Sequence, residues 1–165
     1  MSGGRVVQAA NRWLRKEEVL HWLEDVADPE IPVLSVVDLG VVRDVRVHRD
    51  GVEVLITPTY SGCPAMEVIE ERVQEALARR GVTPTVRRVL SPPWTTDWMS
   101  GAGRRKLAQY GIVPPRAPAH RDHPIACPRC ASTETTRISE FGSTPCKAAW
   151  RCNACREPFE QFKCI

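Results

Sequence analysis

Two short stretches between residues 41 and 57 alternate apolar side chains with other side chains, which is the pattern of β-strands that bury one face. The first stretch, residues 41–48, has valine at most positions of one face, and the second stretch covers residues 52–57. The pair Asp50-Gly51 lies between them and is a common turn sequence. The pattern therefore predicts a β-hairpin.

Apolar residues at helical spacing mark two longer segments. The first covers residues 11–27, and Pro29 is expected to end it. The second covers residues 65–80, where glutamates occupy the outer face and Gly81 follows as a stop signal. Residues 83–90 then read as a third strand. This order predicts an α+β fold, a small mixed sheet with helices on one face.

The segment after this sheet has a different character. A short helix is expected over residues 100–110, and its basic run Arg104-Arg105-Lys106 is either a solvated face or a docking surface. Prolines and polar residues dominate residues 111–126, which predicts a stiff linker. The chain is thus expected to hold one α+β domain followed by a separate smaller module.

Overall charge and hydropathy exclude several classes of protein. The 165-residue chain has a net charge of +3, too small to favour a nucleic-acid or anionic-membrane partner. The first residues lack the apolar run of a signal peptide, and no apolar segment approaches the length of a membrane span. We therefore expect a cytoplasmic protein with neither a nucleic acid nor a membrane as partner.

A cysteine stands where the second strand of the hairpin leads into the following helix. The run Ser61-Gly62-Cys63-Pro64 precedes the helix, and Pro64 suits a first helical turn. Cys63 is therefore predicted at or next to the N-cap, where the amides and the partial positive charge of the helix end favour a thiolate. This position indicates a reactive or metal-binding cysteine. A small buried residue at a strand–helix corner explains it equally well.

The loop of residues 28–40 is rich in groups that cap turns or bind cations. Asp28, Glu30, Ser35 and Asp38 lie within it. By spacing alone, Asp28 and Asp38 are favoured as turn and cap residues that accept hydrogen bonds from nearby amides. The alternative is that one of these side chains faces Cys63 and helps to bind or release a metal.

Four of the seven cysteines form two Cys-x-x-Cys pairs near the C-terminus. Each pair can form a knuckle, and two knuckles joined by β-strands give tetrahedral sulfur coordination. The four sulfurs predict a structural Zn²⁺ site, with iron as the alternative ion. A module of this size has little core, so the metal should supply on the order of 10 kcal/mol of its folding free energy. The predicted ligands are Cys127, Cys130, Cys152 and Cys155.

Several other potential ligands lie near these cysteines. His120 and His123 precede the first pair, but four cysteines already complete a ligand set. Cys146 and Cys164 either pack beside the module or, in the case of Cys146, form a second thiol site with Lys147 stabilising the thiolate. Residues 127–165 carry six basic and four acidic side chains, a weak basis for binding phosphate groups.

Two sets of motifs resemble known families. The runs DPEIPV, SVVDLGVV and TPTYSGCP, between residues 28 and 64, resemble the MIP18 (domain of unknown function 59) family, whose members are tied to iron–sulfur cluster assembly. The runs WTTDWMSGAGRRKLAQYGIVPP and FGSTPCKAAWRCNACREPFEQFKC, at residues 94–115 and 141–164, extend the resemblance. The chain as a whole is similar to the D subunits of bacterial phenylacetyl-CoA epoxidase (ring-1,2-epoxidase) systems.

The resemblance implies a division of the chain and a set of candidate residues. It implies a MIP18-like α+β domain at residues 12–110, a linker at 111–126 and a zinc ribbon at 127–165. It also raises Cys63 and Asp38 as residues that handle iron or a cluster, because this cysteine and the DLG motif recur in the family. No catalytic residue is implied.

The leading hypothesis is a non-catalytic accessory protein of phenylacetate degradation. It would help to assemble or insert the iron centre, iron–sulfur or di-iron, of an oxygenase. Cys63 would hold iron transiently, alone or across a homodimer, and the partners would be oxygenase or reductase subunits. The alternative is a structural or regulatory subunit of the oxygenase that never handles iron. A third hypothesis, a thiol oxidoreductase, would need Cys146 or Cys164 as its resolving cysteine.

Overall fold

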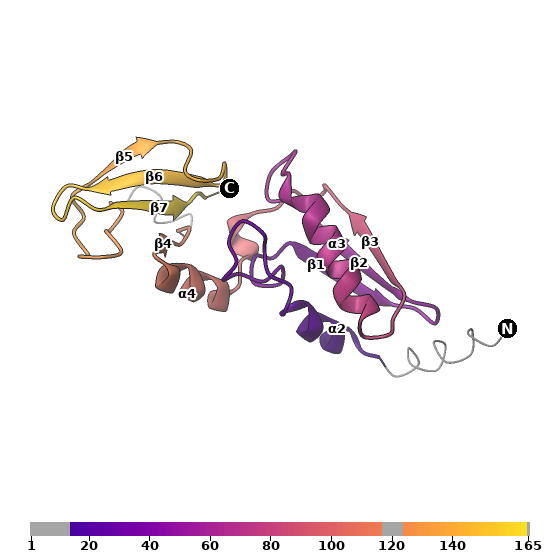
Figure 1. The fold of residues 1–165 in the computed structure, drawn as a ribbon. Helices are drawn as coiled ribbons and strands as arrows, with labels where there is room; N and C mark the ends of the chain where they lie inside the picture. The colour runs from indigo at the N-terminus through magenta and orange to yellow at the C-terminus, as the bar shows by residue number, and fades with distance from the viewer. Residues whose placement is uncertain (1–13, 117–123, 165) are drawn as a thin grey trace. The chain divides into compact units, whose positions relative to one another are not determined.

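The computed structural model of the protein describes residues 14–116 and 124–164 (Figure 1). These residues form two units, with the boundary between Trp94 and Thr95. Each unit has its own sheet.

The first unit is built on a three-stranded mixed sheet. Strands β1 (Val42–Val47) and β2 (Val52–Ile56) form the predicted antiparallel hairpin. Strand β3 (Pro84–Arg88) pairs in parallel with β2, which gives the order β1-β2-β3. The prediction of a small mixed sheet is therefore confirmed. A bulge between Val42 and Asp44 interrupts the alternation that the sequence suggested for β1.

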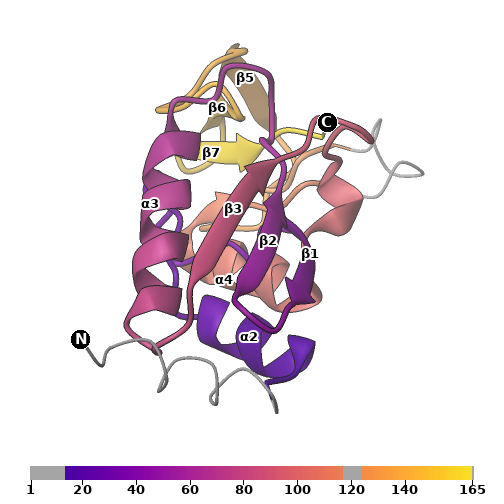
Figure 2. The same cartoon turned by 90° about the vertical axis from the view of Figure 1, so that its right-hand side faces the viewer.

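Two helices accompany this sheet. Helix α3 (Ala65–Ala78) is the crossover that joins β2 to the parallel strand β3, and it lies along the sheet beside β3 (Figure 2). Helix α2 (Lys16–Leu23) contacts both α3 and β1. Their apolar stripes are buried, as the helical spacing predicts. The fully or nearly fully buried side chains of the two helices are Val19, Leu23, Met66, Ile69, Val73 and Leu77.

The first helix is shorter than the sequence pattern predicts. It ends at Leu23, six residues before Pro29, so the expectation that this proline ends it is wrong. The reason lies in the following loop, where backbone hydrogen bonds of Val26 and Asp28 run to Val36 and Leu34 over 2.9 and 2.8 Å. The expected start of the helix, residues 11–13, lies outside the described residues.

The second unit contains a four-stranded sheet in the order β4-β7-β6-β5. Strands β5 (Thr135–Ser139) and β6 (Lys147–Cys152) correspond to the predicted β-segments of the ribbon. Strand β7 (Pro158–Phe162) pairs antiparallel with β6, and β4 (Ile112–Val113) pairs in parallel with β7. Neither β4 nor β7 was predicted. The domain boundaries inferred from the family resemblance stay a prediction.

Short helices open the second unit. The 3-10 helix η2 (Thr96–Trp98) is followed by α4 (Gly101–Tyr110), whose N-cap Ser100 accepts a hydrogen bond from the amide of Gly103 over 2.8 Å. Arg104 donates to the carbonyls of Pro115 and Thr96 over 2.5 and 2.6 Å. The basic run is therefore not simply a solvated face. Within residues 14–116 and 124–164, no helix is both long and apolar enough to span a membrane.

Candidate metal centre and thiol site

The two Cys-x-x-Cys segments fold into matching knuckles. The amide of Cys127 donates to the carbonyl of Ser132, and the amide of Cys152 donates to the carbonyl of Glu157, each over 2.9 Å. The residue after each second cysteine has a positive φ, 61° for Ala131 and 69° for Arg156. This repeated backbone geometry turns both sulfurs of each pair toward one point.

The four sulfur atoms gather at that point. All four lie within 4.8 Å of one another, although they come from segments more than 20 residues apart. The Cys127 and Cys155 sulfurs are 3.7 Å apart, and those of Cys130 and Cys152 are 3.6 Å apart. A zinc ion with four thiolates at about 2.3 Å holds its sulfurs about 3.8 Å apart. The donor set and its spacing therefore fit a tetrahedral metal site.

The surroundings of the sulfurs suit a structural ion. Cys127 and Cys152 are buried in a small core with Ile125 and Phe159, and Trp150 stacks on Phe159 with 6.5 Å between ring centroids. The hydrogen bond from the Cys155 amide outweighs burial and lowers the pKa of the Cys152 thiol to about 7. A thiol that deprotonates near neutral pH is ready to bind a metal.

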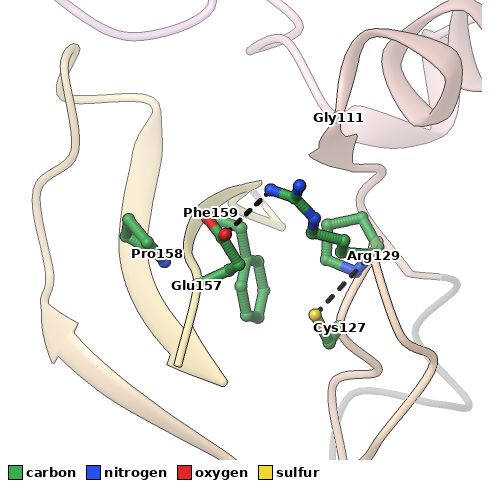
Figure 3. A pocket seen from close by; sticks show the side chains of 7 residues that line it. Gly111, Cys127, Arg129, Glu157, Pro158 and Phe159 are labelled. Atoms are coloured by element: carbon green, nitrogen blue, oxygen red, sulfur yellow. Dashed lines mark hydrogen bonds and ion pairs between the residues drawn. The ribbon is translucent and has the colours of Figure 1, made fainter. Parts of the chain in front are cut away.

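An open cavity of about 330 Å³ lies beside the first knuckle (Figure 3). Arg129 of the first knuckle and Glu157, which follows the second, form an ion pair of 2.9 Å at its edge. The amide of Arg129 also donates to the Cys127 sulfur over 3.4 Å. The ion pair links the two knuckles, and the sequence offered no signal for it.

The two remaining ribbon cysteines have separate surroundings. Cys146 is buried, with its sulfur 3.0 Å from the hydroxyl oxygen of Thr144. The Lys147 ammonium contacts Glu160 at 2.9 Å, and its predicted role in stabilising a Cys146 thiolate stays a prediction. Cys164 is half-buried and its thiol donates to the carbonyl of Arg116 over 3.3 Å. The histidines considered as ligands, His120 and His123, lie outside the described residues.

Cys63 ends a tight turn after β2. Its amide donates to the carbonyl of Tyr60 over 3.2 Å, and Gly62 between them has a φ of 78°. A turn of this kind requires positive φ at its third residue, which explains the glycine. The carbonyl of Cys63 accepts from Met66, and Pro64 is the N-cap of α3. Cys63 therefore sits next to the N-cap and is half-buried.

The expectation that the helix end makes Cys63 a ready thiolate is wrong. Burial raises the pKa of the Cys63 thiol and outweighs the hydrogen bonds from the Ala65 amide and Tyr60. The carboxylates of Glu30 and Asp28 raise it further. A helix terminus gives a limited stabilisation of charge, and desolvation of a thiolate at this corner is the larger effect.

Asp38 acts as a cap within its own loop. Its carboxylate accepts from the amide of Ser35 over 3.2 Å, and its amide donates to the Ser35 hydroxyl over 2.9 Å. Asp28 likewise accepts from the amides of Glu30 and Ile31 over 2.9 and 2.7 Å. Both carboxylates thus have the turn role that spacing favoured. A role of Asp38 in handling iron stays a proposal.

Sequence reasoning missed Arg88 as a neighbour of the thiol. Arg88 ends β3 and lies in register with Ile56, the last residue of β2, from which the chain leaves toward Cys63. Its guanidinium contacts Glu70 of α3 at 2.5 Å. Glu70, and to a smaller extent the charge of Cys63, raise the pKa of Arg88. Only parallel pairing of β2 with β3 brings these residues to one edge of the sheet, and the sequence pattern does not reveal it.

Cys63 offers one ligand rather than a set. Among the residues that the structure describes, the four ribbon cysteines are the only group of three or more metal-ligating side chains with atoms close enough to share an ion.

Comparison with known proteins matches both units. Residues 16–90 match the family model described as an iron–sulfur cluster assembly protein, and residues 113–163 match the PaaD zinc beta ribbon domain. The putative D subunit of the 1,2-phenylacetyl-CoA epoxidase of Escherichia coli is 51% identical over 152 residues, which cover 90% of this chain and 92% of that protein.

Two further similarities concern about half of the chain. The iron–sulfur protein maturation auxiliary factor YitW of Bacillus subtilis is 43% identical over 88 residues, 52% of this chain and 85% of that protein. The solved structure of a DUF59 domain from Bacillus anthracis has a TM-score of 0.53 and 30% identity, covering 56% of this chain and 90% of that one. These findings confirm the predicted resemblance and the fold class.

Proposed function

The chain belongs to the family of 1,2-phenylacetyl-CoA epoxidase D subunits, and from this premise we propose that it is a non-catalytic accessory protein of such an epoxidase system. It helps to assemble or insert the iron centre of the oxygenase in aerobic phenylacetate degradation. Its partners are the oxygenase or reductase subunits, and it works in the cytoplasm. The similarity of the first unit to proteins named as maturation factors supports the iron-related part of this proposal.

The observation that carries the proposal is the half-buried Cys63 at the edge of the parallel β2–β3 pair. Ligands commonly bind outside the carboxyl ends of parallel strands, because loops from neighbouring strands meet there. Cys63 lies in such a loop, with Arg88 at the end of the adjacent strand. Iron is the cargo at this thiol, not a resident cofactor.

A single sulfur suits a carrier. One protein ligand cannot hold iron or a cluster firmly, so the cargo leaves when the client offers a more complete ligand set. The raised pKa of Cys63 also weakens iron binding, because a protonated thiol does not bind metal and iron must first displace the proton. The missing ligands come from the client or from a second copy of the chain.

The ribbon has a structural role in this proposal. Cys127, Cys130, Cys152 and Cys155 hold a Zn²⁺ ion that stabilises the second unit, since their spacing fits four thiolates around zinc. No step of iron transfer passes through this ion. The surface of the folded ribbon contacts the partner subunits.

A transfer assay tests the carrier role. The protein is purified without oxygen, supplied with ferrous iron and sulfide, and mixed with the metal-free oxygenase and reductase. We expect iron incorporation with the wild type and with Cys164→Ala, but a fall to the protein-free rate with Cys63→Ala. Cys164 is a suitable control because it is also half-buried. Equal iron incorporation into the client with all three proteins would refute the carrier role.

The name of the Escherichia coli relative favours one alternative, a subunit that stays in the oxygenase complex and never handles iron. In that case the protein co-purifies with the oxygenase at a fixed ratio, and Cys63 is dispensable.

A further inference from the structure

Two large apolar side chains of the ribbon are exposed to solvent. Ile138 on β5 is 61% exposed, and Phe141 in the loop of residues 140–145, here called the tip loop, is 64% exposed. Aromatic side chains in such positions are frequent anchors of protein interfaces. The tip loop contains the FGST motif, which the proposed function does not use.

The exposure of Ile138 has a specific structural cause. Arg137 pairs with Trp150 and Ser139 pairs with Ala149, so Ile138 is the extra residue of a bulge between β5 and β6. Strand β5 is an edge strand of its sheet. A bulge at a sheet edge redirects a side chain and blocks pairing with a further strand. The ribbon edge is thus shaped for side-chain contacts rather than for strand addition.

Side chains of the adjacent strands β6 and β7 hold the tip loop in place. Both the amide and the hydroxyl of Ser143 donate to the Glu160 carboxylate, over 2.5 and 3.1 Å, and the amide of Gly142 donates to the carbonyl of Lys147 over 2.7 Å. The Lys147 ammonium, whose side chain is 5% exposed, contacts Glu160 at 2.9 Å and donates to Ser143 over 2.5 Å. A loop fixed in this way presents Phe141 at little entropic cost on binding.

The charge beside the ring indicates what the partner offers. The Lys163 ammonium lies 4.7 Å from the centroid of the Phe141 ring and donates to the carbonyl of Glu140 over 3.0 Å. Among residues 14–116 and 124–164, no carboxylate forms an ion pair with Lys163. A carboxylate on the partner would complement this ammonium directly.

We propose that the tip loop docks the chain onto another subunit of the epoxidase system, with Phe141 inserted in an apolar pocket that has a carboxylate at its rim to meet Lys163. The identity of the partner rests on the proposed function. The shorter Bacillus subtilis maturation factor matches only about half of this chain over 85% of its own length, so it has little room for a ribbon. The ribbon is therefore the part that can direct the protein to one client.

Binding measurements with purified components test the docking. Full-length protein is titrated against the purified oxygenase and reductase subunits of the same system. Phe141→Ala should weaken binding about 30-fold, the effect of losing an interface anchor worth about 2 kcal/mol. Lys163→Glu should weaken it about tenfold or more, and Lys163→Arg should preserve it. Tyr110→Ala is the matched control, since Tyr110 is 56% exposed in the same unit, and it should bind like the wild type.

The metal content of each variant, measured beforehand, shows that the ribbon is folded. Unchanged affinity of Phe141→Ala or Lys163→Glu, or no binding of the wild type to any subunit, would overturn the docking proposal. Iron transfer in the same samples separates the two proposals. Loss of binding by these variants, combined with transfer that does not need Cys63, would keep the docking surface and remove the carrier. Unchanged binding with transfer that needs Cys63 would do the reverse.

Discussion

The sulfur of Cys127 lies 3.7 Å from the sulfur of Cys155, although 28 residues separate them in the chain. Four thiolates at such spacing would repel one another, and a cation bound among them removes this repulsion. The apolar cluster around these sulfurs is small, with Ile125 and Phe159 as its buried members besides the cysteines. We therefore expect the fold around the two knuckles to depend on a bound metal ion.

Metal removal should unfold the second unit and leave the first intact. A strong chelator, or Cys152→Ser, removes a contribution on the order of 10 kcal/mol from the ribbon. Limited proteolysis should then cleave after Thr95 while residues 16–90 stay protected, and circular dichroism should show a partial loss of structure. Cys164→Ser, which is not a predicted ligand, should keep both the metal and the protection. A ribbon that resists proteolysis without metal would contradict this dependence.

The partly buried Lys147–Glu160 ion pair of the ribbon should make a measurable contribution to stability. Lys147→Met leaves the Glu160 carboxylate without its ammonium partner and should lower the free energy of unfolding by about 2 kcal/mol. Arg151 on the same strand is exposed, so Arg151→Met should change the free energy of unfolding by less than about 0.5 kcal/mol. Denaturant unfolding at saturating zinc measures both. Equal effects of the two variants would contradict the role of the pair.

The same pair predicts a pH dependence. Burial opposes ionisation of Glu160, but the bonds from Ser143 and Lys147 prevail and lower its pKa. A lowered pKa in the folded state means that the contribution is present above the unfolded pKa of about 4.3 and is lost as the pH falls through the folded pKa. The stability difference between wild type and Glu160→Gln should thus be constant near neutral pH and shrink below about pH 4.3.

The Cys63 thiol should react slowly at neutral pH. Since its pKa is raised, alkylation by iodoacetamide should reach half its maximal rate above the usual thiol value of about 8.5. Glu30→Gln removes a charge that raises this pKa, so its midpoint should move to lower pH. Glu17→Gln on the exposed side of α2 should leave it unchanged. Mass spectrometry of the Cys63 peptide separates this cysteine from the others. A wild-type midpoint below the usual thiol value would contradict the account.

Asp38 can be tested for its two candidate roles. Asp38→Asn keeps an acceptor for the Ser35 amide and removes the charge, whereas Asp38→Ala removes both. If Asp38 acts as a cap, Asp38→Asn should leave the free energy of unfolding nearly unchanged, and Asp38→Ala should lower it by about 1–2 kcal/mol. Iron transfer per folded molecule should then be the same for both variants as for the wild type. If Asn folds normally but lowers transfer severalfold, Asp38 helps to handle iron. Thermal unfolding and the transfer assay distinguish the two outcomes.

Local patterns in the sequence were sufficient for the elements that have strong periodicity. The hairpin, α3 and the two knuckles follow from alternation, helical spacing and Cys-x-x-Cys pairs, and the structure has all of them. The two-residue strand β4 has no periodicity to detect, and β7 comes from a stretch rich in charged and aromatic residues. The end of α2 is set by hydrogen bonds to residues further along the chain, which no local pattern records.

The surroundings of Cys63 depend on tertiary structure in the same way. The position of the thiol next to a helix end was predictable from Gly62 and Pro64. Its raised pKa was not, because burial at the β2–α3 corner and the charges of Glu30 and Asp28 arise only when the loop folds over the sheet edge. The Arg88–Glu70 contact likewise requires the parallel crossover.

The most direct test of the central claim is the turnover of iron transfer at low protein-to-client ratio. A small amount of the protein is mixed with a large excess of metal-free oxygenase and with iron and sulfide, and iron bound to the oxygenase is measured over time. A carrier that holds its cargo through Cys63 alone should load several equivalents of client per molecule, and Cys63→Ala should load none above background. Loading that stops at one client per protein molecule, or that is the same without the Cys63 thiol, would contradict the account.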